Sequence, residues 1–435
     1  MATPEGAKSI LLITIDTLRA DHLETYGYPR NTSPHMAALA RKGIVFENAM
    51  SQAPWTLPAL ASMLTSLYPS QHGVLTNASI LGPAVWTIAE ALRNVGYRTA
   101  AVTSHVWASP RVGMGQGFRR FEEIDFDSVG QASSEKITDM AIAQLKALAS
   151  EPDPVQADRP FLLWVHYFDP HVTYIRHSEY RFADGYPGPL GAKVPVDLLY
   201  RRQRDGRLSQ VDIAYIESVY DEEIAFTDAH LGRLLVKAKT LGLADRVVVA
   251  LTSDHGEAFM EHGRLQHGRD VYDEVVRVPL ILGGAIPEEL RGTRVAVPVE
   301  TAWLPSTFME LAGVDEHSFR GPGLLRGRAT PLEPGWVISE GSYAWGADER
   351  SIAALHESWK LIYRLDDDDY ELYNRTSDPA EKIDRYADPN EEAKRVRELL
   401  ERVIEEHLAR GVAMAPTVEI DGTQREHLRA LGYAE

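Results

Sequence analysis

Residues 9–15 read SILLITI, a nearly continuous apolar run that ends at Asp16. A run of this length without polar alternation is typical of a strand buried on both faces, and hence of a central parallel strand. An acidic residue at the carboxyl end of such a strand lies where open α/β sheets bind ligands. A simpler interpretation is that Asp16 only caps a helix beginning at Thr17.

Similar apolar runs alternate with helix-like segments as far as about residue 315. We expect further strands at 44–46, 98–103, 160–168, 246–251 and 278–282, and helices at 32–41, 87–95, 136–150, 211–241 and 300–312. This alternation predicts an α/β fold, a doubly wound and mostly parallel sheet flanked by helices. Residues 175–210 are rich in Pro, Gly and Arg, and we expect a surface excursion near the site there.

The pattern changes in the last quarter of the chain. Short strands are expected at 336–340, 351–355, 359–363 and 370–373, followed by a charged helix at 391–410. We therefore predict a catalytic domain over 1–320 and a smaller C-terminal α+β subdomain over 321–435, with an antiparallel sheet and a helix.

Composition narrows the function classes. The chain has 435 residues, 44% of them hydrophobic, which predicts a globular protein. The net charge of −18 argues against nucleic acid as a partner. There is no cysteine, so thiolate chemistry and disulfides are excluded. No apolar run predicts a membrane span. No signal peptide is visible, so we expect a cytoplasmic protein, or a periplasmic one if the sequence was trimmed.

A second informative stretch is residues 50–74, MSQAPWTLPALASMLTSLYPSQHGV. Pro58 opens a helix-like run, which places Thr56 at the predicted cap. Free backbone N–H groups and the helix dipole favour an anion at that point. Taken alone, Thr56 would most simply be a helix cap.

Polar residues repeatedly follow the predicted strands. Asp16, Asp254 and His255 are metal ligands in type. Thr56 can join them, since a divalent cation lowers the pKa of a bound hydroxyl. Further histidines are expected at the same edge, although a single loop histidine is most often a surface residue; these are His171, His262 and His267.

Five groups of residues, in order along the chain, carry a family resemblance. They are 13–22 (ITIDTLRADH); 56–58 (TLP) with 64–66 (LTS); 166–171 (HYFDPH); 253–257 (SDHGE) with 267–268 (HG), 272–274 (YDE) and 277–279 (RVP); and 371–374 (ELYN) with 378–381 (DPAE). Together they resemble the sulfatase family of the alkaline phosphatase superfamily.

The resemblance implies roles for individual residues. It implies that Asp16, Asp254 and His255 bind the metal, and that Thr56 is the nucleophile. In related phosphodiesterases and phosphonate monoester hydrolases an Asn at the place of Asn77 binds a substrate oxygen. His171 matches a histidine on the ester group, and His267 lies near where relatives place a leaving-group lysine. His105, after the strand at 98–103, and His262 are further candidates for substrate contacts.

The sequence also departs from the family pattern. Sulfatases of this family convert Cys or Ser in a Cys-x-Pro-x-Arg motif to formylglycine, whereas this chain has Thr56 and Leu60 at the motif's first and last places. Thr17 replaces a second acidic ligand, and a lysine expected near Ser104 is absent. A formylglycine hydrate expels sulfate through its second hydroxyl, which threonine lacks, while a phosphothreonine can be cleaved by water held in line.

We therefore favour a metal-dependent hydrolase of phosphate or phosphonate esters that works through a covalent phospho-Thr56 enzyme. The alternatives are a sulfuric ester hydrolase without formylglycine, and an inactive metal-holding binding protein. We expect one divalent ion, with Zn, Mn or Ca as candidates, and a small-molecule ester substrate. A second ion, bound by Asp169, His171 and His267, and an oligomer both stay open.

Overall fold

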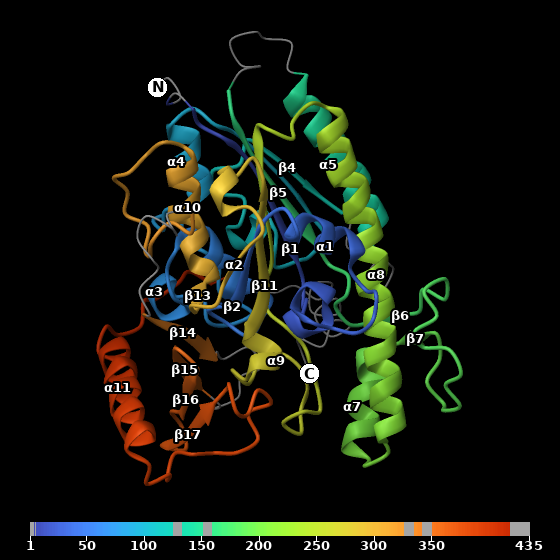
Figure 1. The fold of residues 1–435 in the computed structure, drawn as a ribbon, viewed down its shortest axis with the longest axis vertical. Coiled ribbons are helices and arrows are strands. Elements are labelled where there is room, and N and C mark those ends of the chain that lie inside the picture. The colour runs from blue at the N-terminus through green and yellow to red at the C-terminus, as the bar shows by residue number, and fades with distance from the viewer. Residues whose placement is uncertain are drawn as a thin grey trace.

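The central feature of the fold is a nine-stranded sheet. The computed structural model describes residues 4, 6–124, 133–150, 159–325, 335–341 and 350–417. The strand order is β12-β2-β11-β8-β1-β5-β3-β4, and β13 also pairs with β2. Figure 1 shows β1, β5 and β11 of this sheet in the middle of the molecule, with helices on either side. Their bounds are β1 (Ser9–Ile15), β2 (Ile44–Met50), β3 (Arg98–Thr103), β4 (Arg120–Glu123), β5 (Phe161–Tyr167), β8 (Val247–Ser253), β11 (Arg277–Gly284), β12 (Thr293–Val295) and β13 (Val299–Glu300).

The central position predicted for 9–15 is confirmed. β1 lies parallel between β5 and β8, and all seven of its residues are buried. The predicted mostly parallel sheet is also confirmed, with β11 as an exception that runs antiparallel to both β8 and β2. An apolar run predicts burial but carries no information about strand direction.

Helices cover both faces of the sheet. Because side chains alternate along a strand, Ile10 and Leu12 of β1 join one core, whereas Leu11 and Ile13 join the other. The first core includes α2 (Thr56–Thr65), α4 (Ile88–Asn94) and α10 (Leu304–Leu311). The second includes α1 (Pro34–Ala40), α5 (Ser134–Ala149) and α8 (Gln210–Thr240). This is the doubly wound arrangement expected from the sequence.

Residues 175–210 are more regular than expected. They contain α7 (Val196–Arg204) and β7 (Lys193–Val194), which pairs with β6 (Tyr174–Ile175). The expectation of an irregular excursion is wrong for α7, because Val196 and Leu199 are buried in the second core. Three arginines in its last turn concealed this short apolar face.

The C-terminal part forms the predicted antiparallel sheet and helix. Its strands pair in the order β14 (Trp336–Gly341), β15 (Ser351–His356), β16 (Trp359–Arg364) and β17 (Asp369–Asn374). Helix α11 (Glu391–Leu408) buries its apolar face in a separate core with this sheet. The boundary at residue 320 stays a prediction, and residues 326–334, 342–349 and 418–435 of the predicted subdomain lie outside the described residues.

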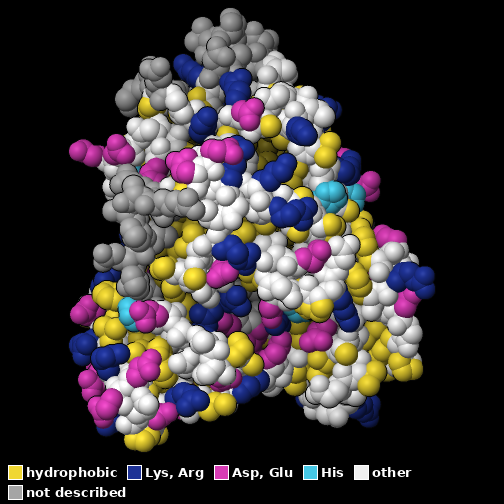
Figure 2. All heavy atoms as spheres, viewed as in Figure 1, with side chains coloured by type: hydrophobic (Ala, Val, Ile, Leu, Met, Phe, Trp, Pro, Cys, Tyr) yellow, Lys and Arg dark blue, Asp and Glu magenta, His cyan; other side chains and the backbone are white. Residues whose placement is uncertain are grey.

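The remaining elements are short. They are α3 (Pro69–His72), α9 (Asp273–Val276), β9 (Ala258–Phe259), β10 (Leu265–Gln266) and 3-10 turns at Ala20–His22, Glu24–Tyr26, Pro110–Val112, Glu288–Leu290 and Thr301–Trp303. Among the described residues, no helix combines the length and the apolar character that crossing a bilayer requires. Acidic and basic side chains are interspersed over the face shown in Figure 2.

Candidate active site

Thr56 is the first residue of α2. The cap position predicted for it belongs instead to Trp55, whose ring packs edge-on against Trp107 at a centroid distance of 6.3 Å. All ten residues of α2 are buried, so the free N–H groups of its first turn lie inside the protein. The Gly268 N–H donates to Pro54 O over 2.8 Å, which ties the loop carrying His267 to the start of this helix.

The side chains that follow β1 and β8 meet Thr56. The parallel register pairs Ile15 with Ser253, so Asp16, Asp254 and His255 emerge at the same level of the sheet. His255 Nε2 lies 3.2 Å from Thr56 Oγ1, 3.4 Å from Asp16 Oδ1 and 3.5 Å from Asp254 Oδ2. The four residues predicted to bind a metal are therefore brought together.

This group has the features of a cation site. Ligand atoms around a tetrahedral ion with bonds of about 2.0–2.2 Å are about 3.3–3.6 Å apart, close to the distances from His255 Nε2. Both carboxylate oxygens of Asp16 and Oδ2 of Asp254 are buried without a hydrogen-bond partner among the described residues. His255 Nδ1 donates to Gly256 O over 2.9 Å, so Nε2 of the neutral ring presents its lone pair. The residues present therefore fit a divalent ion.

The electrostatics point the same way. Burial, together with the charges of Asp254 and Glu257, raises the pKa of Asp16. Burial also raises the pKa of Asp254 and lowers the pKa of His255 well below its usual value. Two crowded carboxylates beside a neutral imidazole are stabilised by a cation among them.

His166 is a member of this cluster that the sequence analysis did not select. Ligand atoms of Asp16, His166 and Asp254 lie within 4.8 Å of one another, and His166 Nε2 is 3.5 Å from Asp16 Oδ2. His166 lies both in the strand expected at 160–168 and in the 166–171 motif, but the resemblance gave a role only to His171 of that motif. The available signal was a histidine inside an otherwise apolar run.

Three further predicted histidines surround the cluster, and all are buried. Ring centroids are 4.4 Å apart for His255 and His267, 5.0 Å for His267 and His171, and 5.7 Å for His171 and His105. Burial lowers the pKa of each of these rings. The histidines are therefore neutral near pH 7 and can donate or accept through defined nitrogens.

Backbone and side-chain partners define those nitrogens. His105 Nδ1 accepts from the Trp107 N–H over 3.0 Å, which leaves the hydrogen of the neutral ring on Nε2. His267 Nδ1 donates to Glu257 Oε1 over 2.8 Å, and Glu257 Oε2 accepts from the Tyr174 hydroxyl over 2.8 Å. Burial raises the pKa of Glu257 to about 7. Glu257 was not among the predicted site residues, although it lies in the SDHGE motif.

The remaining predicted residues are His262, Asn77 and Asp169. His262 Nδ1 lies 2.6 Å from Glu274 Oε1 and its Nε2 lies 2.9 Å from the backbone oxygen of Glu381, so both ring nitrogens are occupied and Nε2 contacts the C-terminal part. Asn77 is half-buried in the loop after α3, and its substrate contact stays a prediction. Asp169 accepts hydrogen bonds from the Ser133 and Ser134 N–H groups at the start of α5, and the second metal site stays a prediction.

Comparison with known proteins places this cluster in a family. The sulfatase family profile matches residues 8–314. The chain belongs to the sulfatase family. It is 26% identical over 424 residues to the uncharacterized sulfatase YidJ of Escherichia coli (86% of this chain, 82% of the relative). It is 24% identical over 427 residues to choline-sulfatase of Rhizobium meliloti (86% and 82%). Because the chain belongs to this family, it is a sulfatase-like ester hydrolase. Members of the sulfatase family bind a divalent metal, and the family lies within the alkaline phosphatase superfamily.

Solved structures share the fold. Phosphonate monoester hydrolase from Silicibacter pomeroyi superposes with a TM-score of 0.71 at 20% identity, covering 96% of this chain and 98% of that one. A protein solved in complex with its substrate D-glucosamine-2-N,6-O-disulfate gives a TM-score of 0.74 at 21% identity, covering 93% and 98%. At these identities the likeness concerns the fold.

In this sulfatase-family chain, Leu60 occupies the position of the motif arginine. Leu60 is fully buried in the core that contains Leu57 and Leu64 of the same helix. Its side chain therefore serves packing, and the charge that the arginine would bring to the site is replaced by apolar contact.

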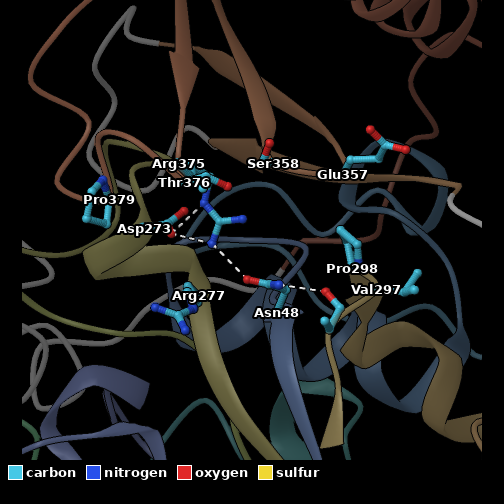
Figure 3. A pocket seen from close by; sticks show the side chains of 11 residues that line it. Asn48, Asp273, Arg277, Val297, Pro298, Glu357, Ser358, Arg375, Thr376 and Pro379 are labelled. Atoms are coloured by element: carbon cyan, nitrogen blue, oxygen red, sulfur yellow. Dashed lines mark hydrogen bonds and ion pairs between the residues drawn. The ribbon is translucent and has the colours of Figure 1, made fainter.

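A separate cavity of about 550 Å³ lies between the two parts of the protein (Figure 3). Arg375 donates to Asp273 over 2.7 Å and to Asn48 over 3.3 Å at its wall, so these polar groups are paired with one another. None of the predicted catalytic or metal-binding residues lines this cavity.

Proposed function

We propose that this sulfatase-family hydrolase cleaves small-molecule phosphate or phosphonate esters with Thr56 as its nucleophile. The observation that carries the proposal is the Thr56 hydroxyl at the start of α2, 3.2 Å from His255 Nε2 and beside two buried carboxylates. A helix terminus and a cation site together suit an ester anion.

The residues have separate tasks in this mechanism. A divalent ion held by Asp16, Asp254 and His255 would lower the pKa of the Thr56 hydroxyl and stabilise negative charge on the ester. Thr56 Oγ1 forms a bond to phosphorus, and the bond from phosphorus to the leaving oxygen breaks. Water then cleaves the phospho-Thr56 ester, which releases the acid product and restores the hydroxyl.

The surrounding histidines bind and protonate. His105 carries its hydrogen on Nε2 and donates to a non-bridging oxygen, as do the first N–H groups of α2. The proton of the Thr56 hydroxyl passes to Nε2 of a neutral imidazole, His171 or His267, which then gives it to the leaving oxygen. His267 is favoured because Glu257 faces its Nδ1 and stabilises the ring while it is charged. Asn77 is proposed to bind a further ester oxygen.

Hydrolysis of sulfate esters is the second candidate. It is supported by the names of the relatives, which include choline-sulfatase. Against it stands the chemistry of position 56, since a threonine sulfate has no second hydroxyl through which sulfate can be eliminated. Attack by water at sulfur would be required instead.

The test compares turnover of p-nitrophenyl phosphate, phenylphosphonate and sulfate esters by the metal-loaded wild-type enzyme and Thr56→Ala. We expect turnover of a phosphorus ester, at least a thousandfold loss in Thr56→Ala, and a phosphate or phosphonate group on Thr56 after acid quenching. Thr65→Ala, at the other end of α2, is the matched control and should keep activity. Full activity of Thr56→Ala would refute the mechanism, and preference for the sulfate ester would establish the second candidate.

A further inference from the structure

His166 has the geometry of a metal ligand that the family resemblance does not assign. It is the sixth residue of β5, and its side chain is fully buried. Nε2 has no hydrogen-bond partner among the described residues and lies 3.5 Å from Asp16 Oδ2, with Asp254 in the same group. That separation is longer than a normal N–H···O bond but suits two ligands of one ion.

The other ring nitrogen of His166, Nδ1, is hydrogen-bonded to Thr14. His166 Nδ1 lies 2.8 Å from Thr14 Oγ1, and Thr14 Oγ1 accepts the indole N–H of Trp164 over 2.9 Å. A hydroxyl oxygen can accept a second hydrogen, so Thr14 can hold the tautomer that metal binding requires, in which Nδ1–H donates to Thr14 and Nε2 turns its lone pair toward Asp16. A lone pair facing a carboxylate is repulsive unless a cation lies between them. Metal-binding histidines are usually oriented by a hydrogen bond of this kind.

Thr17, the residue after Asp16, brings no charge to the site. Its hydroxyl is buried without a hydrogen-bond partner among the described residues, and its φ of 54° is unusual for a β-branched residue. The residue next to Asp16 in the chain is therefore uncharged, while a histidine faces Asp16 from the neighbouring strand.

We propose that His166 is a direct ligand of the ion, beside Oδ2 of Asp16, whereas His255 lies beside Oδ1. The centre then has two carboxylates and two imidazoles. Imidazole nitrogen favours Zn²⁺ and related transition metals, whereas Ca²⁺ and Mg²⁺ prefer oxygen. We infer that the site selects Zn²⁺ or Mn²⁺ over Ca²⁺. This inference rests on the metal site of the proposed function but not on Thr56 as nucleophile.

The test measures metal affinity rather than turnover. Chelator-stripped wild-type protein and His166→Ala are titrated with Zn²⁺, Mn²⁺ and Ca²⁺ against a competing indicator, and bound metal is counted by mass spectrometry. We expect one equivalent of Zn²⁺ in the wild type, at least tenfold weaker Zn²⁺ binding in His166→Ala, and a change of less than threefold for Ca²⁺. His72→Asn is the matched control, since His72 is a buried histidine whose nitrogens face Ser62 and the Val74 N–H.

Two outcomes would overturn the inference. One is Zn²⁺ affinity in His166→Ala within twofold of the wild type. The other is two Zn²⁺ equivalents in the wild type, one of which His166→Ala removes, since that would assign His166 to a separate ion. If His166→Ala does not fold, the visible spectrum of Co²⁺-loaded Thr14→Val replaces it, and an unchanged spectrum would count against the ligand role. Thr56→Ala keeps Asp16, Asp254, His255 and His166 and should still bind one Zn²⁺ while losing turnover, which separates this test from that of the nucleophile.

Discussion

Replacing Lys360 with methionine should destabilise the protein strongly, because this lysine is an ammonium group without solvent contact. It lies on β16 with 0% exposure. Its Nζ is 3.0 Å from Asp273 Oδ1 and 2.9 Å from Glu381 Oε1. Lys360→Met keeps most of the side-chain volume and removes the charge. Removing one partner of a buried ion pair costs about 3–5 kcal/mol.

The local network sets where in that range the cost falls. Arg375 remains on Asp273 at 2.7 Å, so only Glu381 loses its cation. Burial and the charge of Asp273 already raise the pKa of Glu381 to about 7. Without the lysine that pKa rises further and the group becomes neutral, which limits the cost. We expect about 3 kcal/mol at pH 8.

The pH dependence has a definite sign. A carboxyl whose folded-state pKa lies above its unfolded value stabilises the fold at low pH and loses this contribution as pH rises through the folded pKa. Because Lys360→Met raises the pKa of Glu381 further, the variant should be penalised more at pH 8 than at pH 6. Urea unfolding at both values, followed by tryptophan fluorescence and circular dichroism, measures the difference.

A double-mutant cycle makes the reasoning refutable. Lys360→Met combined with Glu381→Gln should be less destabilised than the sum of the two single variants by more than 1 kcal/mol. Lys394→Ala, which removes an exposed ion pair with Glu391, should cost less than about 0.5 kcal/mol. A cost below about 1 kcal/mol for Lys360→Met at pH 8, or additive effects in the cycle, would refute the account.

Three further outcomes are expected. Burial lowers the pKa of His262, but the hydrogen bond and charge of Glu274 prevail and raise it, so its stabilisation is present below about pH 6.5 and lost as pH rises through the folded pKa. His262→Asn should therefore cost more stability at pH 5.5 than at pH 9 in urea unfolding, and equal costs would contradict this. Leu60→Arg places an unpaired charge in the core and should lower the free energy of unfolding by about 3 kcal/mol or more. An unchanged melting temperature would contradict this, because it would mean that the guanidinium reaches solvent or a charged partner. Removal of the metal with a chelator should lower the melting temperature and adding it back should restore it, since a ligand at a thousandfold excess over Kd stabilises by about 4 kcal/mol. A melting temperature that does not change when the chelator is added would contradict a metal site.

Much of the fold could be predicted because burial leaves a clear pattern in the sequence. β1 and β3 begin and end at the predicted residues, since each is an apolar run bounded by polar groups. The direction of β11 could not be predicted, because a buried strand has the same composition in either direction. The helix α7 was missed because two buried residues, Val196 and Leu199, are too few to produce a clear helical period among arginines.

The site was predictable to the extent that it lies at strand ends. Asp16, Asp254 and His255 follow apolar runs, and parallel strands bring such ends together. His166 lies within a strand, so only the lateral register, which pairs Thr14 of β1 with it, places it at the cluster. His262 comes from a loop near the site in sequence, yet its ring is stacked on Tyr272 at 3.6 Å and turned to the other subdomain. Loop residues have no register that would fix such a direction.

The proposed metal ligands and the proposed nucleophile come from different parts of the fold. Asp16 and Asp254 are placed by the pairing of β1 with β8, whose register is fixed by residues buried along the whole length of both strands. Thr56 is the first residue of α2, which packs in the core on one face of the sheet. A change at position 56 therefore leaves the carboxylates where they are, because it alters neither strand. In the proposed mechanism this separation means that the group at position 56 can change without moving the residues that would hold the cation.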